Sequence, residues 1–383
     1  MNRIKVMSVF GTRPEAIKMC PLVKELAQYP EIEPVVCVTG QHREMLDQVL
    51  AAFALRPDFD LDIMEKSQTL SSVTSKVLLG LREVFQKDRP DIVLVHGDTT
   101  TSFAAALAAF YDKIPVGHVE AGLRSFDKMS PYPEEMNRLL TGRLADIHFA
   151  PTPANADNLE REGVRSHVYV TGNTVIDAIH TTVRDDYVFD CDALNHIDYT
   201  GRRVVLMTAH RRENYGAPME QIMQAVAQLA RTRPDLLFVY PVHLSPYVQQ
   251  TAHGYLDGID NVLLTEPLGV FDMHNLMGRV FMVMTDSGGL QEEAPALGKP
   301  VLVLRRETER PEAVQAGTVE IVGTAAGDIL AHAGRLLDDE AHYLRMKRAV
   351  NPYGDGQASR RIAENLLFYF GRRAEPADPF RAR

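Results

Sequence analysis

Cysteine is scarce in this chain of 383 residues: Cys20, Cys37 and Cys191 are scattered and form no Cys-x-x-Cys pair. This pattern argues against a structural zinc site and is typical of a reducing compartment. An excess of basic charge is also missing, since the formal net charge is −10. A nucleic-acid partner, which needs a basic surface, is therefore not expected.

Long apolar runs are absent as well. No stretch approaches the roughly 20 residues of a membrane span, and the apolar start of the chain is too short and interrupted for a signal peptide. Short-period repeats and low-complexity segments are missing too, apart from a ragged terminus rich in arginine and proline. We expect a cytoplasmic protein with no membrane partner.

What the chain does contain is a regular alternation of short apolar runs with helical patterns. This alternation predicts an α/β fold of parallel sheets with helices on both faces. Because there are two series of runs, we expect two doubly wound, Rossmann-like domains. The expected strands are Lys5–Phe10, Val35–Thr39, Asp91–His96, Val116–Val119, Ile147–Ala150 and Val168–Thr171, then Arg203–Met207, Leu237–Pro241, Val262–Thr265, Phe281–Met284, Val301–Leu304 and Val319–Val322.

The break between the two series lies near residues 172–202, which include a polar, poorly periodic segment at 185–192. We place the N-terminal domain at residues 1–174 and the C-terminal domain at 175–357. A last helical pattern at 358–375 can pack back on the first domain. Ligands of open α/β sheets bind beyond the carboxyl ends of the strands, so two such sheets predict a site in a central cleft that both domains face.

The segment after the expected strand at 281–284 predicts a nucleotide diphosphate site. Ser287, Gly288 and Gly289 open a helix there, and two glycines let backbone N–H groups approach an anion at the helix N-terminus. Glu292 and Glu293 follow, and a carboxylate at that distance can bind a ribose diol. For the Ser-Gly-Gly turn alone, an ordinary helix start is the better explanation.

Other cationic groups stand where strands turn into helices. Arg13 and Lys18 follow the first strand, and Arg310 precedes Pro311 after a later one, in positions suited to a diphosphate. A capped helix with solvated charges is the better explanation for Lys18 alone and an equally good one for Arg13. His210 comes just past the strand at 203–207, where it can donate to phosphate or move a proton near neutral pH.

Three acids are candidates for proton transfer. Asp98 and Glu120 each stand two residues after a histidine, at the ends of two strands, and period-two spacing puts each His-acid pair on one strand face. Glu134 enters a helix after a proline-flanked loop, where Glu134 or Glu135 has a structural role in stabilising the helix dipole. Asp98 has an alternative role as a helix cap. The two pairs raise the possibility of a metal site, but we interpret His96 and His118 as packing residues.

Taken together, the motifs resemble the non-hydrolysing UDP-N-acetylglucosamine 2-epimerase family, which has a glycosyltransferase-B-like fold. The resemblance covers nearly the whole chain and rests on nine motifs in order. They are Gly11–Glu15, Gly40–Arg43, His96–Asp98, His118–Arg124, Pro133–Arg138, Thr171–Thr174, His210–Glu213, Asp286–Ala294 and Glu309–Glu312.

The resemblance implies that the chain interconverts UDP-N-acetylglucosamine and UDP-N-acetylmannosamine as a homodimer, with no redox cofactor and no metal. The route is elimination and re-addition of UDP through 2-acetamidoglucal, in a closed, water-free site. Three sets of residues match family positions. The catalytic set is Asp98, Glu120, Glu134 and His210; the substrate-binding set is Arg13, Lys18, Ser287, Gly288, Gly289, Glu293 and Arg310; and a second, activating nucleotide-sugar site matches Gln41, His42, Arg211 and His243.

Other functions remain open from the residues. A glycosyltransferase of the same fold needs an acceptor pocket and one base, whereas this chain offers three acids with His210. A metal-dependent hydrolase would use the His-acid pairs, and a sugar-nucleotide sensor would bind without exchange at carbon 2. A 2-epimerase acting on a modified UDP-aminosugar is a further alternative within the family.

Overall fold

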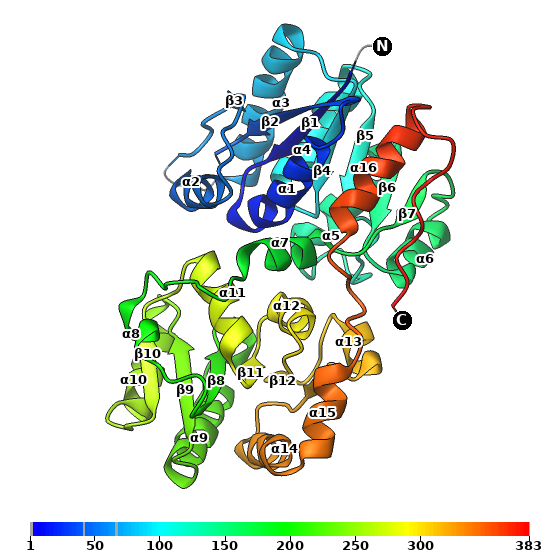
Figure 1. Cartoon of the computed structure of the whole chain (residues 1–383). Coiled ribbons are helices and arrows are strands. Elements are labelled where there is room, and N and C mark those ends of the chain that lie inside the picture. The colour runs from blue at the N-terminus through cyan, green and yellow to red at the C-terminus, as the bar shows by residue number, and fades with distance from the viewer. Residues whose placement is uncertain (1–2, 41–42, 66–67, 383) are drawn as a thin grey trace. The chain divides into compact units, whose positions relative to one another are not determined.

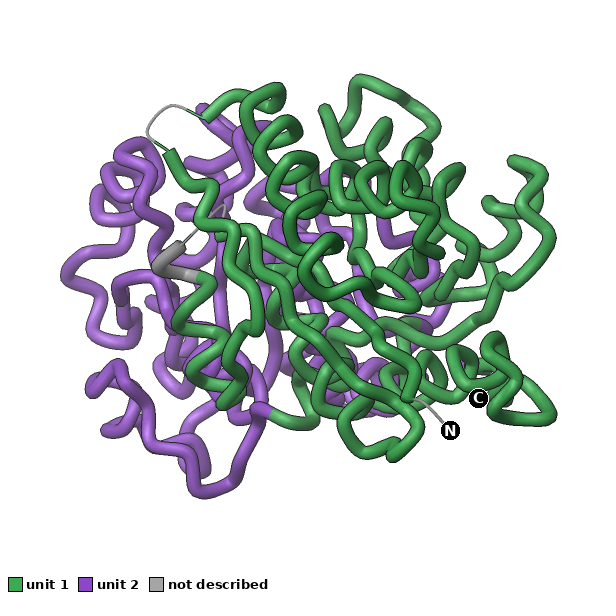
Figure 2. The backbone as a smooth tube through the Cα atoms, turned by 90° about the horizontal axis from the view of Figure 1, so that it is seen from above, with its two compact units in different colours: residues 1–181, 353–381 green, residues 182–352, 382–383 purple. Residues whose placement is uncertain are grey.

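Short, buried strands build two separate parallel sheets in the computed structural model, which describes residues 3–40, 43–65 and 68–382. The chain divides into two units, drawn in different colours in Figure 2. Unit 1 comprises residues 1–181 and 353–381, and unit 2 comprises residues 182–352 and 382–383. The α/β class with two doubly wound domains, predicted from the alternating pattern, is confirmed.

Unit 1 contains a seven-stranded sheet in the order β3-β2-β1-β4-β5-β6-β7, and the paired strands run parallel. Its elements, labelled in Figure 1, are β1 (Ile4–Phe10), α1 (Arg13–Leu26), β2 (Ile32–Val38), α2 (Arg43–Ala52), β3 (Phe59–Asp60), α3 (Leu70–Lys87), β4 (Ile92–His96), α4 (Thr100–Tyr111), β5 (Val116–Val119), α5 (Glu134–Leu144), β6 (Ile147–Ala150), α6 (Pro153–Arg161), β7 (Val168–Val170), α7 (Thr174–Thr182) and α16 (Ala358–Tyr369).

Unit 2 contains a six-stranded parallel sheet in the order β10-β9-β8-β11-β12-β13. Its elements are α8 (Asp192–Asn195), β8 (Arg203–Thr208), the 3₁₀ turn η1 (Arg212–Asn214), α9 (Ala217–Thr232), β9 (Leu236–Pro241), α10 (Pro246–Leu256), β10 (Val262–Thr265), α11 (Val270–Arg279), β11 (Met282–Thr285), α12 (Leu290–Ala296), β12 (Val301–Val303), α13 (Pro311–Ala316), β13 (Val319–Ile321), α14 (Ala326–Asp338) and α15 (Glu340–Arg348).

The central strands are buried along nearly their whole length, which is why their sequences are continuously apolar rather than alternating. Every residue of β4 and of β9 is buried, for example. Figure 1 shows helices flanking each sheet. None of the helices in the described part of the chain is both long and apolar enough to cross a bilayer.

The sequence located every strand of the described residues except β3. This strand has two residues, lies at the sheet edge and pairs only with β2, so it lacks the apolar run that marks the others.

The unit boundaries differ from residues 174 and 357, where the sequence analysis placed them. Helix α7 belongs largely to unit 1, because Asp177 accepts hydrogen bonds from the backbone N–H groups of Ala358 (3.1 Å) and Ser359 (2.7 Å) at the start of α16. Helix α16 also packs against α1 within the same unit. The last helix is therefore part of unit 1 although it follows unit 2 in the sequence.

The strand order of each sheet reverses once, between β1 and β4 in unit 1 and between β8 and β11 in unit 2. At such a switch point the loops from the carboxyl ends of two adjacent strands diverge and leave room for a ligand. In unit 1 these loops begin at Gly11 and Gly97, and in unit 2 they begin at Ala209 and Asp286.

Candidate active site

Glu120 occupies a strained position directly after β5. Its φ of +63° lies in the left-handed region, which a residue with a side chain rarely adopts. One carboxylate oxygen, Oε1, accepts hydrogen bonds from the Lys18 ammonium and from Asn173 Nδ2 at 2.8 Å. The other oxygen, Oε2, lies 3.7 Å from His96 Nε2. The turn thus presents a carboxylate whose orientation is set by three different segments.

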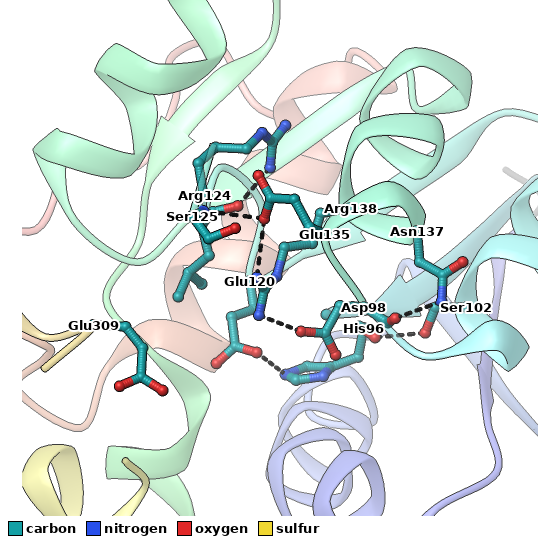
Figure 3. A network of polar contacts seen from close by, with 12 residues as sticks. His96, Asp98, Ser102, Glu120, Arg124, Ser125, Glu135, Asn137, Arg138 and Glu309 are labelled. Atoms are coloured by element: carbon teal, nitrogen blue, oxygen red, sulfur yellow. Dashed lines mark hydrogen bonds and ion pairs between the residues drawn. The ribbon is translucent and has the colours of Figure 1, made fainter. Parts of the chain in front are cut away.

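Asp98 lies on the loop after β4 and is held by α5, as Figure 3 shows. Arg138 Nη2 donates to Asp98 Oδ2 at 2.5 Å, and Asn137 Nδ2 donates to the backbone oxygen of Asp98 at 2.9 Å. The next helix, α4, is capped by Thr99, whose side chain accepts from the N–H of Ser102. The alternative role of Asp98 as that cap is therefore wrong.

The expectation that each His-acid pair shares a strand face is also wrong. The strands end at His96 and Val119, and both Gly97 and Glu120 then turn into the left-handed region, with φ values of +63°. The acids consequently lie on turns at the sheet edge and not on strand faces. The sequence spacing could not reveal this change in backbone conformation.

Glu134 and Glu135 begin α5 but have different surroundings. Glu135 is 1% exposed and accepts hydrogen bonds from the backbone N–H groups of Ser125 and Phe126, both at 3.0 Å. Arg138 Nη1 donates to the same carboxylate at 3.1 Å. Glu135 therefore fixes the β5–α5 loop, whereas Glu134 is only partly buried.

The loop that follows β1 is tied to the loop of Asp98 by a buried carboxylate that the sequence analysis overlooked. Glu15 Oε2 accepts from the N–H groups of Gly11 (3.1 Å) and Thr12 (2.8 Å), while Oε1 accepts from the hydroxyls of Thr99 (2.7 Å) and Ser102 (2.9 Å). The loop with Arg13 at the first position of α1 thus has a defined orientation toward the Asp98 loop.

His96 and His118 are packing residues, as predicted: both are buried, and His118 Nε2 lies 2.8 Å from the carbonyl oxygen of Gly97. Burial lowers the pKa of His96 to about 4 and that of His118 to about 3, because an imidazolium is poorly solvated there. Burial also lowers the pKa of His148 to about 4. In the described part of the chain, no group of three or more His, Cys, Asp or Glu side chains is placed to hold a metal ion.

Because of the lowered pKa values of these three histidines, we expect the folded protein to lose stability in acid. An unfolded histidine binds a proton near pH 6.5, whereas the folded ones do so only near pH 3 to 4. The unfolded state therefore binds more protons below pH 6.5, and the free energy of unfolding should fall by roughly 2–3 kcal/mol per histidine by pH 4.5. Urea midpoints at pH 7.0, 5.5 and 4.5 measure this loss.

A histidine variant separates the loss of stability due to histidines from the contribution of the buried acids. Burial raises the pKa values of Glu15 and Asp177, so these two groups increase the free energy of unfolding as the pH falls. His148→Gln should show a shallower loss of stability with acid. His196→Gln, at a mostly exposed histidine of unit 2, is the control and should keep the full loss. Equal slopes in wild type and His148→Gln would refute the prediction.

In unit 2, His210 lies at the switch point between β8 and β11 and is about one-third exposed. Its ring stacks on that of His243, with centroids 5.2 Å apart and planes 10° apart. Burial lowers the pKa of His210, the Asp286 carboxylate raises it, and His243 and Arg211 lower it. The Nδ1 edge of the His210 ring thus faces the buried carboxylate of Asp286, and the ring is partly exposed to solvent.

The turn at 287–289 is tied to the segment before α13 by a buried amide. Gln291 Nε2 donates to the backbone oxygen of Ser287 at 3.1 Å, and the Thr308 hydroxyl donates to Gln291 Oε1 at 2.5 Å. Arg310 follows and pairs with the buried Glu292. The structure therefore places Arg310 in the same neighbourhood as the glycine turn, but with an acidic partner that the sequence analysis did not foresee.

Two of the residues matched to a second site lie beside His210. His243 stacks on it, and Arg211 Nη2 lies 3.5 Å from where a Cβ on Gly288 would stand. Arg211 also forms a 3.8 Å ion pair with Glu309. The other two residues, Gln41 and His42, fall outside the described residues.

Several functional candidates were missed by sequence reasoning, namely Glu15, Arg138, Asn173, Asp286 and Gln291. All five belong to motifs quoted for the resemblance, but none has a charge pattern that singles it out. Glu15, Asn173, Asp286 and Gln291 are buried and Arg138 is partly buried, and their contacts with the loops of the candidate residues are a property of the folded chain.

Comparison with known proteins identifies the family to which the chain is similar. Residues 24–367 match the family model described as UDP-N-acetylglucosamine 2-epimerase. The chain is 56% identical over 382 residues to the UDP-N-acetylglucosamine 2-epimerase of Bacillus subtilis, covering 99% of both chains. It is 53% identical over 372 residues to that of Escherichia coli K12, covering 95% of this chain and 98% of the relative.

Solved structures of members of the same family also match the chain. A crystal structure of UDP-GlcNAc 2-epimerase from Neisseria meningitidis bound to UDP-GlcNAc matches with a TM-score of 0.87 at 48% identity, over 95% of this chain and 100% of the other. The Methanocaldococcus jannaschii UDP-GlcNAc 2-epimerase in complex with UDP-GlcNAc and UDP matches with a TM-score of 0.75 at 30% identity, over 95% and 100%. A glycotransferase of kitacinnamycin, at 13% identity and a TM-score of 0.65 over 96% and 100%, shares the fold.

Proposed function

Because the chain belongs to the UDP-N-acetylglucosamine 2-epimerase family, we propose that it inverts carbon 2 of UDP-N-acetylglucosamine to give UDP-N-acetylmannosamine, reversibly. The relatives carry this activity in their names, and two solved relatives were crystallised with UDP-GlcNAc. The observation that carries the proposal for this chain is the Glu120 carboxylate on its left-handed turn, held by Lys18 and Asn173.

The reaction we propose is elimination followed by re-addition. The carbon 2 hydrogen of the sugar has no neighbouring carbonyl on the ring, so its direct removal is very difficult. If the bond from carbon 1 to UDP breaks, the electron pair leaves with UDP and carbon 1 becomes electron-poor. Loss of the carbon 2 proton then leaves its electron pair as the double bond of 2-acetamidoglucal. UDP adds back after a proton is delivered to the opposite face.

Acid-base groups in unit 1 suit the proton transfers. We assign removal and return of the carbon 2 proton to Asp98, Glu120 and Glu134, since delivery to two faces needs more than one group. Arg138 positions Asp98 through the 2.5 Å contact, and Asn173 and Lys18 position Glu120.

Cationic and N–H groups suit the departing diphosphate. We assign this role to Arg13, His210, Arg310 and the turn Ser287–Gly289, with Glu293 at the ribose. Fixed donors of this kind stabilise negative charge as it develops on the leaving oxygen. The proposal needs no redox cofactor, because elimination and re-addition move protons and break and form the bond from carbon 1 to UDP, and no step transfers a hydride.

A proton NMR time course in heavy water tests the proposed function. The pure protein, given UDP-N-acetylglucosamine and no acceptor, should produce UDP-N-acetylmannosamine that carries deuterium at carbon 2. No turnover without an acceptor would favour a glycosyltransferase. Product that keeps its original hydrogen at carbon 2 would exclude elimination.

A second nucleotide-sugar site that activates the enzyme is also proposed, with Gln41, His42, Arg211 and His243 as its residues. It is supported by the positions of Arg211 and His243 beside His210, where binding can alter the active residue directly. The expected rate is a sigmoidal function of UDP-N-acetylglucosamine concentration, and traces of this substrate should accelerate the reverse reaction. A hyperbolic dependence that His243→Ala leaves unchanged would contradict this.

We further propose that the protein is a homodimer. Unit 1 exposes large apolar side chains on its packed helices α3 and α4: Leu79 is 64% exposed, Phe110 57% and Tyr111 67%. The rings of Phe110 and Tyr111 lie side by side, with centroids 6.4 Å apart, and exposed apolar side chains of this size are found at protein interfaces. Sedimentation velocity should give a dimer that Phe110→Glu weakens, and a monomer in wild type would refute the proposal.

A further inference from the structure

Asp286 is the first residue after β11, and its carboxylate is completely buried. Its Oδ2 atom accepts three hydrogen bonds, from the N–H of His210 (2.9 Å), the N–H of Arg211 (2.8 Å) and Asn214 Nδ2 (3.0 Å). These bonds attach the turn after β8 to the end of β11. Oδ2 alone therefore accounts for the structural role of the side chain.

The second oxygen, Oδ1, has no hydrogen-bond partner in the described part of the chain, although it is buried. It points toward the ring of His210, and its distance from Nδ1 is 3.5 Å. An unsatisfied buried carboxylate oxygen is costly, so its placement beside a donor nitrogen needs an explanation. A small rotation of the imidazole would bring the two atoms within hydrogen-bond distance.

We propose that Asp286 is a positioning residue for His210: its Oδ1 holds the imidazole with the proton on Nδ1 and leaves Nε2 to face the substrate. The proposal rests on the proposed function, in which His210 acts on the departing diphosphate. The Asp286 carboxylate also offsets the positive charge of the ring when Nε2 carries a proton, so His210 can donate a charged hydrogen bond.

Of the groups around His210, the Asp286 carboxylate favours the protonated imidazole, and the others disfavour it. The ring of His243 is stacked on it, Arg211 is the next residue, and both lower its pKa, as does burial. His243 Nδ1 accepts from the N–H of Ser245 at 3.0 Å, so its proton is on Nε2. The buried phenol of Tyr240 donates to the backbone oxygen of Ala209 and stays neutral, since burial and Asp286 raise its pKa. Among the described residues, Asp286 is the acid that stabilises the protonated form of His210.

Asp286→Asn tests the proposal because asparagine keeps one acceptor oxygen for the turn but places an amide at Oδ1. The amide donates to Nδ1, which forces the proton of neutral His210 onto Nε2. The pKa of His210 should fall by about one unit, since a nearby carboxylate is lost. kcat for the nucleotide sugar should fall by about 10- to 100-fold, by analogy with the loss of the hydrogen-bond partner that orients a metal-bound histidine.

Nitrogen-15 NMR of the His210 ring in the free protein reports the tautomer and the pKa of His210 and needs no turnover. In wild type above the histidine pKa, the proton should be found on Nδ1; finding it on Nε2 would overturn the proposal even if the variant does not fold. In Asp286→Asn, lower kcat with an unchanged tautomer and pKa would also overturn it and leave only the structural role of Oδ2.

Asp272→Asn is the matched control. Asp272 is a second buried carboxylate of unit 2, which accepts from Tyr187 Oη (2.8 Å) and from the N–H groups of Asp190 (3.0 Å) and Cys191 (2.9 Å). Its removal should leave the His210 tautomer and pKa unchanged; an equal shift in both variants would refute a specific pairing. If wild type does not epimerise UDP-N-acetylglucosamine, the proposed function fails, while the tautomer still decides the pairing of Asp286 with His210.

Discussion

Glu120→Gln should lower kcat for epimerisation by about 10²- to 10⁴-fold, the usual loss on removing a general acid or base. Glutamine fills the same volume and can still accept from Asn173 Nδ2, now 2.8 Å from the carboxylate. It cannot accept a proton from carbon 2. UDP affinity should be retained or rise, because one negative charge beside Lys18 disappears. Single-turnover kinetics and UDP calorimetry on the same preparation measure the two effects separately.

Glu162→Gln is the control for this substitution. Glu162 is a glutamate of unit 1 with similar exposure, 18% against 12% for Glu120, and it is ion-paired with Arg124 at 2.6 Å. It has no assigned role in the reaction, so the variant should keep most of its turnover. If Glu120→Gln loses UDP binding and kcat in equal proportion, Glu120 acts in binding or in holding the turn, and the catalytic assignment fails.

Arg310→Ala should weaken UDP binding by about 10- to 150-fold, which corresponds to the ~1.5–3 kcal/mol of a charge-assisted contact. It should also lower the thermal midpoint, for a reason visible only in the structure. Arg310 pairs with Glu292, whose side chain is 4% exposed, and truncation leaves that buried carboxylate without this cation. Breaking a buried pair on one side is usually strongly destabilising.

A double variant separates the two consequences. In Arg310→Ala combined with Glu292→Gln, the buried carboxylate that lost Arg310 is gone, so the thermal midpoint should recover toward wild type. UDP affinity should remain low, because the cation is still missing. If affinity recovers together with stability, or if Arg310→Ala binds UDP as wild type does, Arg310 is a structural partner of Glu292 and is not a diphosphate ligand.

The elements themselves were largely predictable, because each parallel strand is a short apolar run and each helix a periodic one. The ends of β4, β5 and β8 could therefore be located, and with them Asp98, Glu120 and His210. The strand ends matter because parallel strands bring distant residues to one sheet edge. Among the strands of the described residues, only β3 escaped detection, since an edge strand of two residues has no periodicity to recognise.

The partners of the site residues were not predictable, because they come from segments far apart in the sequence. Glu15 contacts Thr99 and Ser102 across more than 80 residues, and Asp286 contacts His210 across 76. No local pattern marks a carboxylate that will be buried beside another loop. For the same reason, Glu134 and Glu135 are equivalent as helix-start acids until the fold buries only Glu135 under the loop at 125–126.

The sequence by itself thus determined the fold class, the family and the residues at the carboxyl ends of the strands, since these follow from local hydrophobic pattern and motif order. The tertiary structure decided which groups surround them: the left-handed turn that aims Glu120, the Glu292 partner of Arg310, and the Asp286 oxygen that faces His210. The physical reason is that charge and orientation in a buried site depend on desolvation and on contacts over a few ångströms, and chain folding alone brings those contacts together.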